Sequence, residues 1–311
     1  MNKLNNNEEN LKKLKTLATC ASISVSVLLS LIKAGAAIAT GSLSVLSSMI
    51  DSFTDVLSST ISFIAVKFAN KPLTDHHRYG YGKAESVSAL IQAAFIAGSG
   101  GFILYDGISR FINPSPVTQT QIGLWIMAIS IVLTIALISF QSVVVKITKS
   151  QAIEADSAHY TVDLLTNGAI IISLLVVRYL NWQWFDSATA VVISSYLLIN
   201  AARIALNALE EITDHEVDNK IKQKIIDIVD SEAEIKGYHD FRTRVSGLRM
   251  FIEIHLEMEG SLTLAAAHDI SDRVEEKITT AFPMAQIIVH QDPFGLREKR
   301  LDHEIEGHCD L

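Results

Sequence analysis

Cysteine is almost missing from this chain, and so are several other features that point to common functions. Its two cysteines, Cys20 and Cys309, lie far apart, one at the start of an apolar stretch and one near the C-terminus. A disulfide is therefore not expected, and a cysteine-based zinc site is excluded. The net charge is −8 and no long basic stretch occurs, so nucleic-acid binding is not indicated. The first 17 residues are polar and lack a cleavable signal pattern, which predicts that the first apolar segment stays as an anchor.

Apolar residues are plentiful and unevenly distributed. Hydrophobic residues make up 49% of the 311 residues, and the mean hydropathy is +0.30. Most of them lie between about 18 and 209, whereas the chain from about 213 onward resembles an ordinary soluble domain. This distribution predicts an integral membrane protein with a sizeable soluble part.

The apolar region divides into segments long enough to cross a bilayer, which takes about 20 residues. We expect six spans, at about 18–40, 43–68, 85–112, 118–145, 154–180 and 185–208. Ten lysines and arginines flank these spans on one side and two on the other. Since positive residues favour the cytoplasmic side, both termini are expected in the cytoplasm. Small residues, as in AGSGG at 97–101, favour close helix packing in lipid.

Two pairs of ionisable residues interrupt these apolar helices. Asp51 and Asp55 lie in the second span, and His159 and Asp163 in the fifth. Each pair is spaced i, i+4, so its two side chains share one helix face about 6 Å apart. A charge in hydrocarbon costs several kcal/mol and is normally kept for a function. A structural alternative is that such residues pair with each other or cap helix breaks, and the sequence leaves open whether the pairs lie at the same depth.

The residue types in these pairs favour a divalent metal. One imidazole nitrogen and carboxylate oxygens in fourfold coordination suit Zn²⁺. Three aspartates oppose the charge of the ion, so a loaded site would be close to neutral. An empty site would hold repelling carboxylates that take up protons, so metal and proton binding should compete. These considerations predict metal transport coupled to proton exchange.

The C-terminal region alternates helix and strand patterns in the order α-β-β-α-β. Residues 217–231 carry a helical apolar stripe, and a second helix is expected at 263–281, opened by Thr263. Three strands with the helices on one sheet face are expected. The predicted domains are a cytoplasmic N-terminal segment, a transmembrane domain, a cytoplasmic metal-binding and dimerisation domain, and a disordered tail. Their limits are 1–17, 18–209, 213–293 and 294–311.

These motifs together resemble a known family. The DxxxD and HxxxD pairs, with HHRYGYGKAES, EADSAHYTVD and VHQDP, resemble the bacterial zinc and ferrous-iron efflux branch of the cation diffusion facilitators. The resemblance covers about residues 15–293. It implies six transmembrane helices plus a cytoplasmic αββαβ domain of metallochaperone-like fold, assembled as a homodimer in the bacterial inner membrane. It also implies export of Zn²⁺, or of Cd²⁺ or Fe²⁺, driven by inward proton flow.

A second cluster of candidate ligands lies in the cytoplasmic domain. Strand alternation puts His255 on the polar face, and His290 and Asp292 share one face of the last strand. A lone surface histidine is usually only solvated, but the resemblance implies a binuclear zinc site in which Asp292 bridges two ions. Its residues would be His239, His255, His268, His290 and Asp292.

Two further features follow from the resemblance. The family's loop site after the second span maps to Thr74, His77 and Tyr81, of which only His77 is a good ligand. Asp75 and His76 are alternative ligands in a different register, and a solvated loop without metal is the other interpretation. Lys83 and Asp214 match a pair that interlocks the dimer at the junction of the two domains.

Lys33 lies inside the first span, where it could either reach the interface or face a polar cavity.

Other functions remain open alongside transport. A metal-gated channel would conduct without proton coupling, and a membrane-bound sensor would depend mainly on the cytoplasmic histidines. No separate nucleophile motif supports a membrane hydrolase, so an enzyme is not predicted. The sequence does not determine which metal is carried, because Zn²⁺, Cd²⁺, Fe²⁺ and Co²⁺ can share such ligands.

Overall fold

The computed structural model describes residues 2–40, 43–112, 121–180, 182, 184–296 and 300–304. The chain forms two compact units. Residues 9–212 make up a helical unit, and residues from 213 onward, together with the first eight, make up the second unit. Each unit is described by itself.

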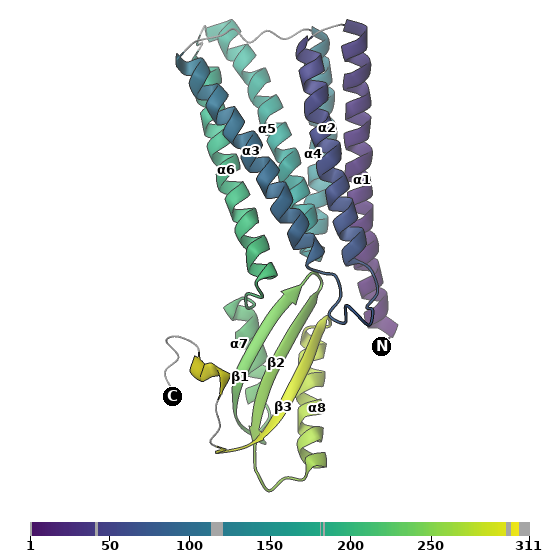
Figure 1. Ribbon diagram of the computed structural model, residues 1–311, viewed down its shortest axis with the longest axis vertical. Coiled ribbons are helices and arrows are strands. Elements are labelled where there is room, and N and C mark those ends of the chain that lie inside the picture. The colour runs from purple at the N-terminus through teal and green to yellow at the C-terminus, as the bar shows by residue number, and fades with distance from the viewer. Residues whose placement is uncertain are drawn as a thin grey trace. The chain divides into compact units, whose positions relative to one another are not determined.

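Over its described residues, the helical unit contains six long helices that lie side by side, the first of them from residue 9 onward (Figure 1). They are α1 (Asn2–Thr40), α2 (Leu43–Ala69), α3 (Ala84–Ile112), α4 (Gln121–Thr148), α5 (Gln151–Leu180) and α6 (Trp184–Ile212). α1 already begins within the polar N-terminal segment, because no proline or glycine precedes Gly35 to break it.

Four stretches of these helices are long and apolar enough to cross a membrane. They are Glu8–Gly35, Ala84–Ile112, Trp125–Thr148 and Ser187–Ile212. Over their described residues, α2 and α5 are not among the four, and these two helices carry the paired ionisable residues. A helical membrane domain is therefore shown, while six spans stay a prediction.

α3 and α6 approach each other closely through small residues. A Cβ atom on Gly107 would lie 2.9 Å from the Cβ of Ala190, and one on Gly100 would lie 3.3 Å from the Cβ of Leu197. Real Cβ atoms essentially never come as close as the first of these distances. The expectation that small residues serve helix packing is confirmed at this contact.

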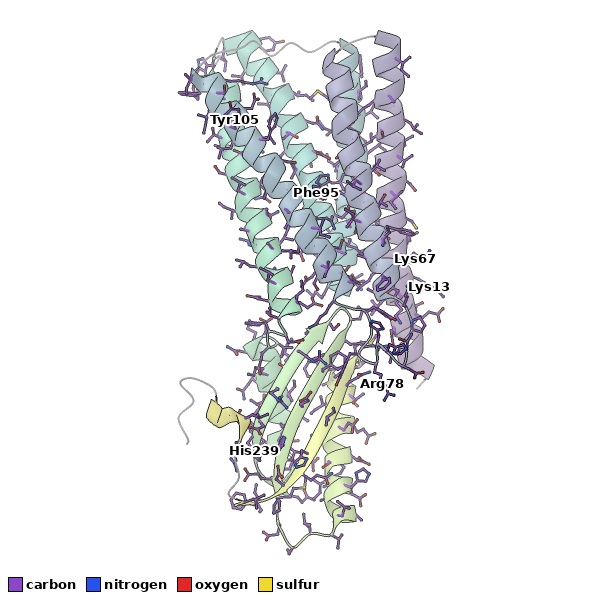
Figure 2. All side chains as sticks on the ribbon, in the orientation of Figure 1. Lys13, Lys67, Arg78, Phe95, Tyr105 and His239 are labelled. Carbon is purple, nitrogen blue, oxygen red and sulfur yellow. The ribbon has the colours of Figure 1, made fainter. Side chains whose placement is uncertain are left out.

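Basic side chains gather at one end of the helical unit. Lys13, Lys67 and Arg78 all lie there, whereas Tyr105 lies toward the opposite end (Figure 2). α2 ends and α5 begins at the end where the basic residues gather.

The second unit has the predicted α-β-β-α-β order. It contains α7 (Asn219–Asp230), β1 (Ile235–Ser246), β2 (Arg249–Met258), α8 (Leu264–Ala281) and β3 (Ala285–Pro293). β1 pairs antiparallel with β2, and β2 pairs parallel with β3. Thr263 caps α8 by accepting a hydrogen bond from the backbone N–H of Ala266, as expected.

Both helices cover the same face of this sheet (Figure 1). Ile252, Ile254 and Leu256 alternate along β2 and are buried against the apolar sides of α7 and α8. The intervening residue His255 therefore lies on the opposite, polar face, as its position in the strand pattern predicted.

The structure describes part of the C-terminal segment for which we predict disorder, residues 294–296 and 300–304. Leu301–Glu304 form a short 3-10 turn, η1. Asp302 donates its backbone N–H to Asp240 Oδ1 at 2.9 Å, and its carboxylate accepts the N–H of Asp240 at 2.8 Å. Reciprocal bonds with the side chain and the backbone of Asp240 in β1 hold this segment, a contact that local sequence patterns do not reveal.

Candidate metal sites

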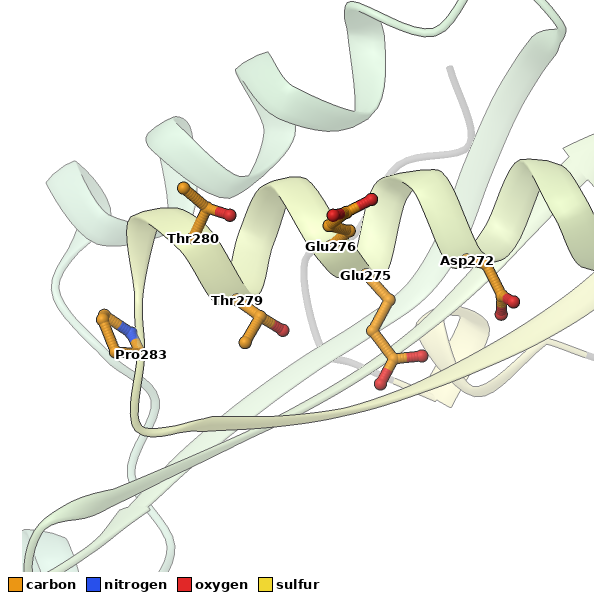
Figure 3. A pocket seen from close by; sticks show the side chains of 6 residues that line it. All are labelled: Asp272, Glu275, Glu276, Thr279, Thr280 and Pro283. Atoms are coloured by element: carbon orange, nitrogen blue, oxygen red, sulfur yellow. The ribbon is translucent and has the colours of Figure 1, made fainter. Parts of the chain in front are cut away.

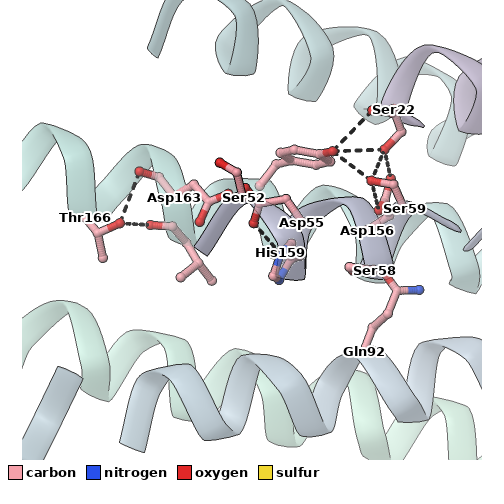
Figure 4. A network of polar contacts seen from close by, with 12 residues as sticks. Ser22, Ser52, Asp55, Ser58, Ser59, Gln92, Asp156, His159, Asp163 and Thr166 are labelled. Carbon is pink, nitrogen blue, oxygen red and sulfur yellow. Dashed lines mark hydrogen bonds and ion pairs between the residues drawn. The ribbon is translucent and has the colours of Figure 1, made fainter. Parts of the chain in front are cut away.

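The helical unit brings three of the four paired residues together. Asp55 of α2 and His159 and Asp163 of α5 have ligand atoms that all lie within 4.8 Å of one another (Figure 4). We call these residues the helical triad. His159 Nε2 lies 3.2 Å from Asp55 Oδ1, which places the two pairs at one level and answers the question of depth. Asp51 lies one turn before Asp55 in α2, and its side chain lies outside the described residues.

The helical triad is well enclosed by protein. Asp55 is 7% exposed and His159 is 4% exposed, and Asp163 is half-buried. The Nδ1 atom of His159 is buried and has no hydrogen-bond partner among the described residues. An imidazole with an unused nitrogen beside two carboxylates is a suitable ligand for a divalent ion.

A second buried polar group lies directly beside the helical triad, and our sequence predictions missed it. Asp156 of α5 is fully buried and sits one turn before His159 on the same helix. It accepts hydrogen bonds from Ser22 of α1 and Gln141 of α4 (Figure 4 shows Ser22 and Asp156). The i, i+3 spacing of an acid before His159 in EADSAHYTVD is the signal that could have revealed it.

Lys33 points into the helical unit rather than toward its outside. It is 9% exposed, and its Nζ donates to Ser52 Oγ at 2.6 Å. Ser52 lies on α2 one turn before Asp55. Of the two alternatives for Lys33, reaching the membrane interface or facing a polar interior, the structure therefore supports the second.

Three histidines align across the sheet of the second unit. His239 of β1 is paired in register with His255 of β2, which is paired with His290 of β3. We call them the histidine row. Neighbouring ring centroids are 4.9 Å and 4.5 Å apart. The row lies on the sheet face opposite the two helices, so no core packing competes for these side chains.

Asp292 lies at the centre of the histidine row. Its Oδ2 is 2.9 Å from His255 Nδ1 and 3.4 Å from His239 Nε2, and its Oδ1 is 3.2 Å from His290 Nε2. The two carboxylate oxygens thus face different imidazoles, which is the arrangement that a bridging carboxylate needs. Metal-capable groups form at His239, Asp240 and His255, and at His255, His290 and Asp292.

His268 does not join these groups within one chain. Its side chain is 65% exposed on α8, and its Nε2 lies 3.6 Å from Asp272 Oδ2. The structure adds two carboxylates that sequence reasoning missed, Asp240 and Glu257. Glu257 Oε1 lies 3.0 Å from His239 Nδ1. A bulge in β1 turns Asp240 toward the row, and its φ angle is 47°.

The C-terminal segment contacts both added carboxylates. Arg300 lies 2.5 Å from Glu257 Oε1. Burial alone would raise the pKa of Asp240, but the backbone N–H groups of Asp302 and Leu301, helped by His255 and His239, hold that pKa below its usual value. Asp240 is therefore ionised at neutral pH and available to a cation.

An open hollow of about 580 Å³ at the end of α8 is a separate feature (Figure 3). It is lined by Asp272, Glu275, Glu276, Thr279, Thr280 and Pro283. None of these lining residues is a histidine, so the hollow is separate from the histidine row.

The loop after α2 forms contacts of its own. Thr74 and His77 make a backbone bridge, and Thr74 Oγ1 lies 3.3 Å from Tyr81 Oη. The rings of His77 and Tyr81 stack at 4.3 Å. Asp75 and His76 are exposed, and no described residue of this loop belongs to a metal-capable group. Stacking and hydrogen bonding thus account for the loop without metal, and the loop site stays a prediction.

The two interlock residues lie in different units. Lys83 Nζ donates to the carbonyl oxygen of Ile212 at 3.1 Å, within the helical unit. Asp214 Oδ1 lies 3.4 Å from Arg244, within the second unit. Their pairing with each other stays a prediction.

Comparison with known proteins assigns the chain to a family. Residues 19–213 match the model of the cation efflux transmembrane domain, and residues 217–294 match that of the cation efflux protein, cytoplasmic domain. The chain therefore belongs to the cation efflux family, the cation diffusion facilitators, as the motifs indicated. It is a membrane-spanning cation efflux transporter and not an enzyme.

Similar proteins include the cation-efflux pump FieF of two strains of Escherichia coli, K12 (DH10B) and O157:H7 (EC4115). Each is 41% identical over 281 residues, which cover 90% of this chain and 93% of FieF. Among solved structures, CzrB in its zinc form is 28% identical and the metal-bound C-terminal domain of the CzcD transporter from Thermotoga maritima is 20% identical. They cover 28% and 25% of this chain and 99% and 93% of their own chains, each with a TM-score of 0.25.

Proposed function

We propose that this protein exports Zn²⁺, or a similar divalent ion, from the cytoplasm in exchange for protons. The observation that carries the proposal is the convergence of Asp55, His159 and Asp163 in the interior of the helical unit. Asp51, one turn before Asp55, would complete a four-ligand site. The FieF relatives are named cation-efflux pumps, which supports the direction of transport.

Proton coupling follows from the charges of the site. Carboxylates held close together in a buried setting repel one another unless a cation lies between them. A divalent ion neutralises them when the site is loaded, and protons do so when it is empty. Exchange of one for the other keeps the site near neutrality in both states, which lowers the cost of moving it between the two sides of the membrane.

We further propose six spans, with both termini in the cytoplasm of a bacterial cell and the inner membrane as location. The gathering of Lys13, Lys67 and Arg78 at one end of the helical unit supports this orientation. α2 and α5 would cross the membrane despite their charges, because those charges face the interior of the helical unit.

The cytoplasmic unit would act in dimerisation and metal sensing. The match of residues 217–294 to the family's cytoplasmic domain supports a homodimer. Cations bound by the histidine row, Asp292 and the predicted ligand His268 would draw two acidic domains together, with His268 reaching the site only through assembly or rearrangement. In this proposal the loop site after α2 contributes little, so this exporter works with fewer metal sites than the family pattern contains.

Metal uptake into proteoliposomes tests the transport site. Zn²⁺, Cd²⁺, Fe²⁺ and Co²⁺ are each offered to wild type and to Asp163→Ala, with and without a pH gradient. Asp163→Ala should reduce uptake to the level of protein-free vesicles. Asp106→Asn is a matched control, because it removes a carboxylate that is half exposed and bound to Arg110 on α3. Equal uptake by wild type and Asp163→Ala refutes the assignment.

The same assay separates the alternatives. A metal-gated channel would conduct without saturation and without a pH gradient, so independence from pH would overturn the proton-exchange part. A sensor centred on the cytoplasmic unit would keep its function in Asp55→Ala and lose it in His255→Ala. The transporter predicts the opposite dependence on Asp55.

A further inference from the structure

Two polar rungs connect α2 and α5 one helical turn apart. The first rung joins Asp55 to His159 at 3.2 Å. The second joins Ser59 to Asp156, with Ser59 Oγ 3.4 Å from Asp156 Oδ1. Asp55 and Ser59 are four residues apart on α2, and Asp156 and His159 are three residues apart on α5. Each pair therefore lies on one face of its helix. The second rung therefore lies about 5 Å along the helices from the first. Figure 4 shows the residues of both rungs. Ser59 is closer than Asp55 to the end of α2, and Asp156 is closer than His159 to the start of α5, so the second rung lies toward the end of the unit where the basic residues gather.

The second rung is surrounded by oxygen atoms from three helices. Ser22 Oγ of α1 donates to Asp156 Oδ2 at 2.5 Å and lies 2.9 Å from Ser59 Oγ. Tyr160 Oη lies 2.7 Å from Ser59 Oγ and 3.4 Å from Ser22 Oγ. Asp156, Ser22 and Ser59 are fully buried. Unlike the helical triad, this group contributes no imidazole.

Asp156 has no cationic side chain in ion-pair contact among the described residues. Its direct partners are the two serines and Gln141, all of them neutral. A carboxylate inside a helix bundle is costly without a positive partner. A cation that occupies the rung would supply that partner.

Besides the uncompensated carboxylate of Asp156, Gln141 gives a second indication that a cation binds here. It is fully buried, and its Nε2 donates to Asp156 Oδ2 at 2.7 Å. Its carbonyl oxygen Oε1 is buried and has no partner among the described residues. Half a turn of the amide would place this oxygen against Asp156, where a bound cation would use it as a ligand and relieve its unsatisfied state.

We propose that Asp156, the hydroxyls of Ser22 and Ser59, and the amide oxygen of Gln141 form a second cation-binding station. It takes a divalent ion on oxygen ligands alone and holds it one helical turn from the helical triad. Carboxylate, hydroxyl and carbonyl oxygens suit hard cations, so Mn²⁺ is a suitable probe. The place of this station on the route of the exported ion rests on the proposed transport function, whereas binding itself does not.

Mn²⁺ binding to the full-length protein in detergent, followed by electron paramagnetic resonance, tests the station. The background is His159→Ala with His255→Ala, which removes one imidazole from the helical triad and one from the histidine row. Asp156→Asn in this background should lower Mn²⁺ affinity at least tenfold, whereas Asp106→Asn should leave it unchanged. Equal Mn²⁺ binding with and without Asp156→Asn overturns the proposal.

A milder variant guards against a folding defect. Ser22→Ala with Ser59→Ala keeps the carboxylate and should weaken Mn²⁺ binding, and Asp156→Glu should restore part of what Asp156→Asn loses. Suppose that Asp156→Asn loses thermal stability while the double serine variant binds Mn²⁺ as tightly as its background. The cluster would then serve helix packing, and the station would be overturned. If Asp156 carries protons instead, Asp156→Asn should change how metal uptake depends on the pH gradient and leave Mn²⁺ binding unchanged. This result would also overturn the station.

The two proposals fail separately. If Asp156→Asn weakens Mn²⁺ binding but the wild-type protein takes up no metal, transport is refuted and the station is kept. Uptake that depends on Asp163, with no binding that depends on Asp156, would do the reverse.

Discussion

A buried ion pair between α1 and α3 offers a sharp test of what holds the helical unit together. Lys15 Nζ lies 2.7 Å from Glu85 Oε1, and the two side chains are 1% and 3% exposed. Ser150, just before α5, donates its hydroxyl to the other carboxylate oxygen of Glu85. This contact therefore ties three parts of the chain together at the end where α2 ends and α5 begins.

Glu85→Gln keeps the shape of the side chain and removes its charge. Lys15 would remain buried without an anion, and breaking a buried pair in this way costs about 3–5 kcal/mol. Replacing both partners, as in Lys15→Met with Glu85→Gln, should recover most of this loss, because no buried charge is then left unpaired.

Thermal unfolding of the full-length protein in detergent, followed by circular dichroism, measures the effect. At about 2–4 °C per kcal/mol for a unit of this size, the single variant should melt about 6–20 °C below wild type. Exposed pairs contribute at most about 1 kcal/mol, so a shift of less than about 4 °C would refute the argument from burial. A double variant as unstable as the single one would refute it equally.

Two further changes test the packing of the helices and the charges of the second unit. Gly107→Ala would press its Cβ atom against Ala190 at 2.9 Å and should destabilise the α3–α6 contact by about 1–3 kcal/mol in detergent melts, whereas Gly98→Ala meets no atom within 4 Å and serves as control. A hydrogen bond and charge from Lys277 lower the pKa of Glu232 below its ordinary value of 4.5. Wild type should therefore be more stable than Glu232→Gln above pH 4.5, and this advantage should disappear as the pH falls through the lowered pKa; an advantage that is unchanged in acid would contradict the pairing.

Local patterns in the chain were enough to predict most elements of the fold. The six long helices follow from runs of apolar residues, and the α-β-β-α-β order follows from alternating strand patterns and the Thr263 cap. These features depend on neighbours within a few residues, so one sequence suffices to recognise them. The beginning of α1 was not predicted, because the apolar run marks only the membrane-spanning part of a helix that already begins at Asn2. The contact of the C-terminal segment with β1 was not predicted either, because it depends on distant residues, Asp302 and Asp240.

The candidate sites were predictable only in part. The i, i+4 spacing places His159 and Asp163 on one helix face, and nothing local shows that Asp55 reaches the same level. The three histidines lie on different strands, and only the register of β1, β2 and β3 aligns them. His268 is exposed on α8, apart from the histidine row, and its position in the sequence does not reveal this separation.

By itself, the sequence determined the class of this protein, since apolar helices interrupted by paired ionisable residues, together with the family motifs, indicate a membrane cation transporter. Tertiary structure alone decided which charges meet. Asp156 finds its partners on α1, α2 and α4, and Lys15 finds Glu85 on another helix. Burial raises the cost of every unpaired charge, so the packing of helices that are distant in sequence selects these partners, and no local pattern records that selection.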